Sequence, residues 1–252
     1  MYNPNSRNNN PYGNSPFGNN RRNNSFGSRY QYQTVYGNSG MTQSSSSLIS
    51  KVMSLLAFSF IFATLGTFVG FTLPLTFGGY WAVAIAGFVV LFALNVLIQK
   101  QGINLILLYL FTFLQGMALG PLVSAYVNAG LSNLLGQAFI ITALTSLGLG
   151  LYSWTTKRDF SRLGDYLFFG VILLLVTGII GILFHSTVFT LLISFVGVAI
   201  FSGYVLFYVQ RAKYMADTLP NAIGLTVSIF ITVLNLFIYI LQILSIMRDD
   251  RR

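Results

Sequence analysis

Five polar side chains recur through the last long apolar run of the chain, residues 222–247. They follow one another at steps of four, three, four and three residues: Ser228, Thr232, Asn235, Tyr239 and Gln242. At about 100° per residue, this spacing puts all five on one narrow face of a helix. An unpaired hydroxyl or amide is costly to bury in hydrocarbon, so this polar stripe should face protein or a wet cavity. We therefore expect the last helix to lie at the centre of a bundle.

A second polar face is predicted on the preceding apolar run, residues 187–209. It carries Ser194, Gly197, Phe201, Tyr204 and Tyr208 within a narrow arc. We expect this face to meet the polar stripe, with Tyr208 hydrogen-bonded near Thr232 or Asn235. Gln115 in the third apolar run is a further polar candidate. Together these residues would form either a polar seam that sets the register of the helices or a water-lined pathway for ions.

The residue types that other intramembrane chemistries require are absent or misplaced. The chain has no cysteine, which excludes disulfides and Cys-ligated metal sites. His185 is the single histidine and lies at a predicted turn, which disfavours a histidine-ligated metal or a Ser–His dyad. All lysines lie at predicted helix ends, which disfavours a retinal Schiff base, and no Gly-x-Gly-Asp signature occurs. We expect neither an enzyme nor a bound cofactor.

The composition is that of an integral membrane protein. Of the 252 residues, 54% are hydrophobic and only 8% are charged, and the mean hydropathy is +0.70. Soluble domains carry about a quarter of charged residues. The net charge of +9 could indicate nucleic acid, but the lysines and arginines are spread over the tails and short loops, as membrane orientation requires. A nucleic-acid partner is therefore disfavoured, and the lipid bilayer is the expected partner.

The chain divides into a polar tail and a membrane domain. Residues 1–47 are rich in Asn, Ser and Gly, a composition typical of a disordered cytoplasmic tail. Four arginines among Tyr and Phe leave open a membrane-surface segment or one that binds protein partners: Arg7, Arg21, Arg22 and Arg29. Residues 48–252 hold seven apolar runs near the ~20 residues that span a bilayer. These runs are 52–73, 78–98, 104–127, 134–154, 164–184, 187–209 and 222–247. An all-α polytopic bundle of seven transmembrane helices follows.

The distribution of basic residues predicts the orientation. With the N-terminus inside, the inner segments hold 11 lysines and arginines, and the outer ones hold the other three, Arg248, Arg251 and Arg252. Because basic residues are enriched on the cytoplasmic side, we expect a cytoplasmic N-terminus. The three C-terminal arginines would also be cytoplasmic if the last helix were re-entrant. We expect this helix to span the membrane because it is long enough.

Small residues predict close helix packing in two of the runs. Ser59, Ala63, Gly66 and Gly70 share one face of the first run. In the third run, Gln115 and Gly116 precede a Gly120–Pro121 pair, which loosens the backbone hydrogen bonding and must be shielded from lipid. We expect ordinary packing of membrane helices at the first face and a kink at the Gly–Pro pair.

The connection after the fourth run carries the most specific motif. It reads Thr155, Thr156, Lys157, Arg158, Asp159, Phe160 and Ser161. Asp159 or Ser161 could cap the next helix, Asp165 complements its positive start, and Lys157, Arg158 and Arg162 could hold the loop at an anionic membrane surface. Read with the segments 119–122 and 234–239, this motif resembles the Bax inhibitor-1 family, the bacterial YccA-like and eukaryotic TMBIM proteins. The likeness covers about residues 48–246.

The resemblance implies a seven-helix bundle with a central last helix and a proton-sensitive calcium leak. In the better understood members, one aspartate closes the sixth helix in a Tyr-Asp-Thr-Gln-Arg type motif, and another precedes the Asn of the last helix by three residues. The matching positions here are Tyr208 and Thr232. Two neighbouring carboxylates share a proton, which pushes the pKa of one of them toward neutral pH, whereas tyrosine and threonine do not titrate in that range. The departure makes such pH gating doubtful.

Two functions from different classes remain. The first is a passive pathway for calcium or other cations, or a regulator of one. The second is a non-conducting scaffold or stress-adaptation protein that acts through protein contacts, which the missing acid pair favours. The Asn-rich tail and the lack of a targeting signal fit a bacterial inner membrane.

Overall fold

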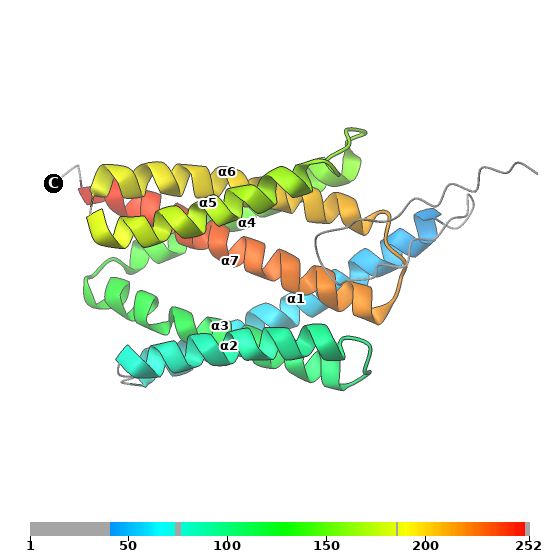
Figure 1. Cartoon of the computed structure of the whole chain (residues 1–252), viewed down its shortest axis with the longest axis horizontal. Coiled ribbons are helices and arrows are strands. Elements are labelled where there is room, and N and C mark those ends of the chain that lie inside the picture. Colours follow the sequence, from blue (N-terminus) through cyan, green and yellow to red (C-terminus); the bar gives the residue numbers. More distant parts are fainter. Residues whose placement is uncertain (1–40, 74–76, 185, 250–252) are drawn as a thin grey trace, which may run out of the picture. The chain divides into compact units, whose positions relative to one another are not determined.

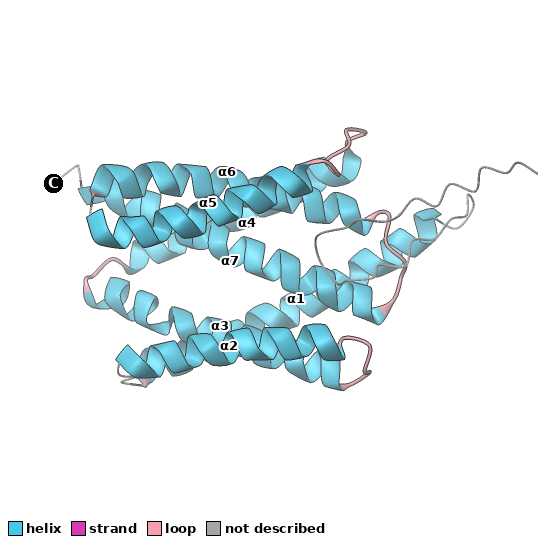
Figure 2. Cartoon of the chain, viewed as in Figure 1, coloured by secondary structure: helices cyan, strands magenta, loops and turns pink. Residues whose placement is uncertain are grey.

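Seven long helices make up the computed structural model within the residues that it describes, 41–73, 77–184 and 186–249. They are α1 (Met41–Thr72), α2 (Phe77–Leu97), α3 (Ile103–Asn128), α4 (Ser132–Thr155), α5 (Leu163–Phe184), α6 (Thr187–Ala212) and α7 (Leu219–Asp249). Short loops join them (Figure 2). Each is long and apolar enough to cross a membrane, which confirms the predicted seven-helix membrane fold.

The helix ends lie close to the predicted ones, apart from the start of α1. This helix begins at Met41, although its apolar span begins only at Ser47. The predictions for the tail at residues 1–40 and for His185 lie outside the described residues. Two connections turn at glycines with positive φ, Gly102 at +83° and Gly130 at +70°, a conformation that side chains with a Cβ rarely adopt.

Helix α7 is the centre of the fold. It runs between a group of α1, α2 and α3 and a group of α4, α5 and α6 (Figure 1), and it contacts α1, α3, α4 and α6. No residue from Met215 to Ile246 is exposed, and Phe230 and Leu236 are fully buried. By contrast, α2 contacts only α3, and α5 contacts only α6. The predicted central position of the last helix is therefore confirmed.

The closest packing is between α1 and α3. A Cβ added at Gly66 would overlap the carbonyl oxygen of Phe113, and one added at Gly116 would overlap that of Ala63. Two backbones can approach this closely only where neither helix carries a side chain at the contact. The Thr67 hydroxyl crosses the same contact and donates to the Gly116 carbonyl at 3.0 Å. The predicted small-residue face of α1 thus packs against the glycines of α3.

Pro121 lies inside α3 at this contact. Proline has no N–H, so the carbonyl of Met117, four residues earlier, loses its intrahelical donor. That carbonyl lies directly against Gly70 of α1, where a Cβ would overlap it. The weakened segment of α3 is therefore shielded from lipid by α1, as expected for a Gly–Pro pair in a membrane helix.

An ion pair ties α1 to the connection between α6 and α7. Lys51 Nζ lies 2.9 Å from Asp217 Oδ1, with side-chain exposures of 47% and 21%. Partial burial opposes ionisation of Asp217, but hydrogen bonds from Lys51 and Ser47 outweigh it and hold the pKa below the ordinary aspartate value. A lowered pKa stabilises the fold above the unfolded-state pKa, and this contribution is lost as the pH falls through the folded-state value.

We therefore expect Asp217→Asn to cost about 0.2–1 kcal/mol at neutral pH, the range of partly exposed ion pairs. The difference from the parent should disappear as the pH falls through the lowered folded-state pKa of Asp217, because the carboxyl is then protonated in both states. Thermal unfolding in detergent at several pH values measures this. Adding Lys51→Gln to Asp217→Asn should cost nothing further, and a full additional loss would show that the two side chains act independently.

Candidate functional site

The two predicted polar faces meet along α6 and α7. Ser194 is fully buried, and its hydroxyl is shared between the Thr190 carbonyl of its own helix at 2.7 Å and Gln242 Oε1 of α7 at 2.9 Å. Next along α6, Gly197 lies under the Tyr239 ring, whose nearest atoms are 2.7 Å from where a Cβ would stand. The Phe201 ring also stacks on the Tyr239 ring, and the centroids of the two rings are 5.8 Å apart. These contacts define the α6–α7 seam.

Tyr208 closes the opposite end of the seam. Its side chain hydrogen-bonds to Ser228, and its ring stacks on Tyr204 with centroids 5.4 Å apart. The prediction placed this bond near Thr232 or Asn235, and Ser228 lies one turn before Thr232 and two turns before Asn235 on α7. The difference follows from the register, because Ser194 pairs with Gln242 and both helices rise about 1.5 Å per residue. Fourteen residues along α6 from Ser194 to Tyr208 match fourteen residues back along α7, from Gln242 to Ser228.

The middle of the polar stripe bonds to its own helix. Thr232 Oγ1 donates to the Ser228 carbonyl at 2.7 Å, and Asn235 Nδ2 donates to the Ile231 carbonyl at 2.8 Å. Ser228 Oγ donates to the Gly224 carbonyl at 2.9 Å. These donors are satisfied without water, and Thr232 is 3% exposed. The stripe therefore needs no aqueous cavity to exist inside a membrane.

Gln115 is not part of the seam. It lies on α3 facing α2, where its Nε2 is 3.9 Å from the position of a Cβ on Gly87. The reason is helical geometry: its neighbour Gly116 packs on α1, and a step of one residue turns the side chain by about 100°. The seam is thus built from α6 and α7.

Carboxylates do not reach the seam within the described part of the chain. Asp159 and Asp217 lie in connections, and Asp165 lies in the first turn of α5. No cluster of three His, Cys, Asp or Glu residues that could hold a metal occurs among the described residues. Calcium usually takes six to eight oxygen ligands including carboxylates, which the seam does not supply.

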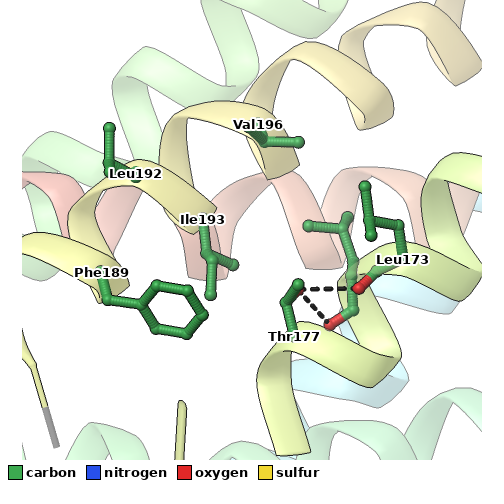
Figure 3. Close-up of a pocket in the computed structure, with 7 residues that line it drawn as sticks. Leu173, Thr177, Phe189, Leu192, Ile193 and Val196 are labelled. Carbon is green, nitrogen blue, oxygen red and sulfur yellow. Dashed lines mark hydrogen bonds between the residues drawn. The ribbon is translucent and has the colours of Figure 1, made fainter. Parts of the chain in front are cut away.

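An apolar groove with a volume of about 140 Å³ lies between α5 and α6 (Figure 3). It is lined by Leu173, Leu174, Thr177, Phe189, Leu192, Ile193 and Val196. The Thr177 hydroxyl donates to the Leu173 carbonyl at 2.8 Å and to that of Leu174 at 3.2 Å. Because its one side-chain hydroxyl is already bonded, the groove offers nothing to an ion.

The motif loop, residues 156–162, is held by a residue that the sequence analysis missed. Gln210 on α6 is 5% exposed, and its amide donates to the Arg158 carbonyl and accepts from the Phe160 N–H. Within the loop, Asp159 accepts from both the N–H and the hydroxyl of Ser161 rather than capping α5. The Ser161 N–H is the main cause of the lowered pKa of Asp159.

The first residues of the motif serve the helix end and the turn. Thr155 Oγ1 donates to the Leu151 carbonyl at 3.0 Å, and the Thr156 hydroxyl accepts from the Arg158 N–H. Lys157 and Arg158 are exposed. The motif is therefore a local turn that Gln210 fixes to α6.

Comparison with known proteins places this architecture in a family. The family described as "Inhibitor of apoptosis-promoting Bax1" matches residues 45–249, which include all seven spans. The chain belongs to the Bax inhibitor-1 family. An uncharacterised membrane protein of Vibrio cholerae is 39% identical over 58% of this chain and 66% of its own length, just under two thirds. The uncharacterised protein Cj0236c of Campylobacter jejuni is 30% identical over 78% and 87%.

Relatives of this Bax inhibitor-1 family chain also occur outside bacteria. Protein lifeguard 4 of the mouse is 29% identical over 62% of this chain and 63% of its own length. The Golgi anti-apoptotic protein of vaccinia virus is 28% identical over 62% and 64%. The family that the motif loop and the last helix predicted is therefore confirmed.

For this member of the Bax inhibitor-1 family, we expect Ser194→Ala to lower the stability of the folded bundle by about 0.6–2 kcal/mol, the range for polar contacts between membrane helices. The substitution removes the donor to Gln242 and leaves a partly buried amide oxygen unpaired. Unfolding in mixed detergent measures the loss. Adding Gln242→Leu to the same variant should recover part of it, whereas fully additive losses would contradict a direct bond.

Proposed function

We propose that this chain is a Bax inhibitor-1 family membrane protein whose resting bundle is closed to ions and which acts through protein contacts. The observation that carries the proposal is the α6–α7 seam. Its donors Ser194, Ser228, Thr232 and Asn235 are bonded within the seam or to their own helix. Tyr208 and Thr232 stand where the family's acid pair is expected.

A cation crossing this seam would meet little compensation for its lost hydration. Tyr239 packs on Gly197 and Phe201, so aromatic carbon fills the contact that a pathway would have to open. An ion that enters a low-dielectric interior without opposite charge loses many kcal/mol of solvation. These contacts agree better with a closed seam that determines helix register than with an ion pathway.

The description of the family and the name of one relative support a role in cell survival or stress adaptation. The family description refers to inhibition of apoptosis-promoting Bax1, and the vaccinia relative is called anti-apoptotic. We carry over only the class of action, which is regulation through contacts with other proteins. The inventory of side chains supports neither an enzyme activity nor a bound cofactor, and the N-terminal tail is our candidate for contacting protein partners.

Calcium flux in liposomes tests the closed-seam proposal. The purified full chain should release calcium no faster than protein-free liposomes from about pH 6 to about pH 8, the range in which a shared-proton acid pair titrates. An ionophore added at the end supplies the positive control for trapped calcium. Flux that is well above the lipid background and changes with pH would overturn the proposal.

A calcium leak is the second candidate function, and one feature favours it. The Asn235 side-chain oxygen has no hydrogen-bond partner among the described residues, and Ser228, Asn235 and Gln242 are only partly buried. An oxygen of this kind could bind a passing cation or water. The same liposome assay decides between the two functions.

We further propose a bacterial inner membrane location with the N-terminus inside. The bacterial relatives and the basic residues at the Lys157 end of the bundle support this placement. Because the chain has no cysteine, a single Lys157→Cys variant reports sidedness directly. In intact cells it should resist a membrane-impermeant maleimide that labels Ala129→Cys, an exposed position in the connection between α3 and α4, and the reverse pattern would contradict the orientation.

A further inference from the structure

We propose that the motif loop is a preformed binding surface for the headgroup of an anionic phospholipid, and that Gln210 holds it in shape. The partner is a bilayer lipid whose phosphate meets Lys157, Arg158 and Arg162. This inference is independent of whether the α6–α7 seam conducts ions.

The loop backbone is fixed from one side. The buried amide of Gln210 bonds to the Arg158 carbonyl and to the Phe160 N–H, the two peptide groups that flank Asp159. A side-chain amide that donates and accepts on one short segment restrains both its position and its direction. The cations on this segment therefore begin from a fixed geometry, which lowers the entropy cost of binding.

A second set of hydrogen bonds holds the end of α4 beside the loop. Lys213 Nζ donates to the Ser153 carbonyl at 2.6 Å and lies 5.5 Å from the centre of the Trp154 ring. Ser153 Oγ in turn donates to the Leu206 carbonyl of α6 at 2.7 Å. Burial lowers the pKa of Lys213. The end of the α4–α6 contact that adjoins the loop is thus fixed by side chain to backbone bonds.

The exposed charges of the loop favour an anion. Lys157, Arg158 and Arg162 are exposed, and none of them forms an ion pair within the described residues. The opposing acids are Asp159, whose two oxygens both accept from Ser161, and Asp165 in the first turn of α5. Lys213 adds a further cation beside the loop. The local balance is positive, as charge complementarity with a phosphate requires.

The position of the loop selects a lipid rather than a soluble partner. The loop joins spans that end at Thr155 and begin at Leu163, so its cations lie at the depth of lipid headgroups. Tyr152 and Trp154 just before it are exposed at 44% and 37%, as aromatic residues at a membrane interface commonly are. A short, fixed loop at this depth meets headgroups before it meets a soluble protein.

The two tryptophans of the chain provide a test with an internal control. Trp154 adjoins the loop, and Trp81 lies near the start of α2, at the opposite end of the bundle. The full chain carrying Trp81→Phe is reconstituted in phosphatidylcholine with a small fraction of brominated phosphatidylglycerol or brominated phosphatidylcholine. Quenching of Trp154 should show a preference for phosphatidylglycerol of at least about fivefold at low salt, the factor expected for each net cation near the surface. The Trp154→Phe protein, reporting from Trp81, should show a ratio near one.

Two variants separate charge from shape. Replacing Lys157, Arg158 and Arg162 together by glutamine should bring the ratio at Trp154 close to one, while Lys157→Arg with Arg158→Lys and Arg162→Lys should keep it. Gln210→Leu keeps all three cations but removes the restraint, and it should lower the preference at least about twofold. A ratio near one in the parent, which would leave the surface to a soluble acidic partner, overturns the proposal. An undiminished ratio in Gln210→Leu overturns the preformed geometry.

Discussion

Replacing Gly116 by alanine is expected to destabilise the folded bundle by about 3 kcal/mol or more, which is at or above the upper range for overpacked cores. The added Cβ would overlap the Ala63 carbonyl oxygen of α1, and that oxygen belongs to a backbone that cannot rotate away. Either the helices separate or α1 bends. Separation also stretches the bond from Thr67 to the Gly116 carbonyl, so one methyl group disrupts the most extensive contact in the bundle.

Gly148→Ala is the matched control for this substitution. Gly148 is also inside a membrane helix, α4, but nothing lies within 4 Å of its added Cβ. Alanine there should be neutral or stabilising by up to about 1 kcal/mol, because glycine is the poorer helix former. Thermal and detergent-induced unfolding of both variants measures the difference. Ala63→Gly should not rescue Gly116→Ala, since the overlap is with backbone, and a rescue would contradict this account.

The sequence predicted half of that contact. The small-residue face of α1 was visible as Ser59, Ala63, Gly66 and Gly70 at helical spacing, and Gly116 and Gly120 were visible in the third run. What spacing alone does not reveal is that these two sets meet. Many helix pairs can use small residues, and only the three-dimensional arrangement shows which carbonyl opposes which glycine.

The number, order and extent of the helices followed from physics that acts locally. A bilayer requires about 20 apolar residues with every backbone group bonded internally. Each apolar run could therefore only form a membrane-spanning helix. The central place of α7 was also predictable, because five polar side chains on one face could not be left in lipid. None of its residues from Leu219 to Ile246 is exposed, which agrees with that reasoning.

The register of the α6–α7 seam was harder to predict from the sequence. The two faces were predicted correctly, and Tyr208 bonds to Ser228, one turn from Thr232 and two turns from Asn235, the residues near which the bond was predicted. Periodicity specifies which side chains share a face and leaves the sliding of one helix along the other undetermined. The Ser194–Gln242 bond supplies that information, and both of its members were in the predicted faces.

Gln210 was missed for a different reason. Its partners, Arg158 and Phe160, lie 52 and 50 residues away, and they offer backbone groups rather than side chains. A contact of this kind leaves no pattern in the sequence of the loop. The available signals were a polar amide at the end of an apolar run, which is common at membrane surfaces, and the match of Gln210 to the Gln of the family's Tyr-Asp-Thr-Gln-Arg type motif.

Replacing Thr232 by aspartate is expected to make the stability of the bundle strongly dependent on pH. Thr232 is 3% exposed near the middle of α7, and no lysine or arginine lies in the middle of a described span. An acid buried without a partner charge stays protonated in the folded state but ionises in the unfolded state near its ordinary pKa. The folded state then binds more protons, so the stability falls as the pH rises above about 4.

The loss should reach about 2.5–3.5 kcal/mol at alkaline pH, the cost of a carboxylate at the centre of a membrane helix. Unfolding of Thr232→Asp and Thr232→Asn across this pH range measures it. The asparagine variant has nearly the same shape and no charge, so it should show the weak pH dependence of the parent.

The same variant separates the two functions. In a closed seam the ionised acid finds neither water nor cation, so calcium flux through Thr232→Asp liposomes should equal that of the parent while its stability falls. If a wet pathway runs along α7, water and calcium would stabilise the carboxylate, because an opposite charge favours the ionised form. The stability would then change little with pH, and calcium flux would rise as the acid ionises. That pair of results would contradict the closed seam at the residue where the family's acid is replaced by a hydroxyl.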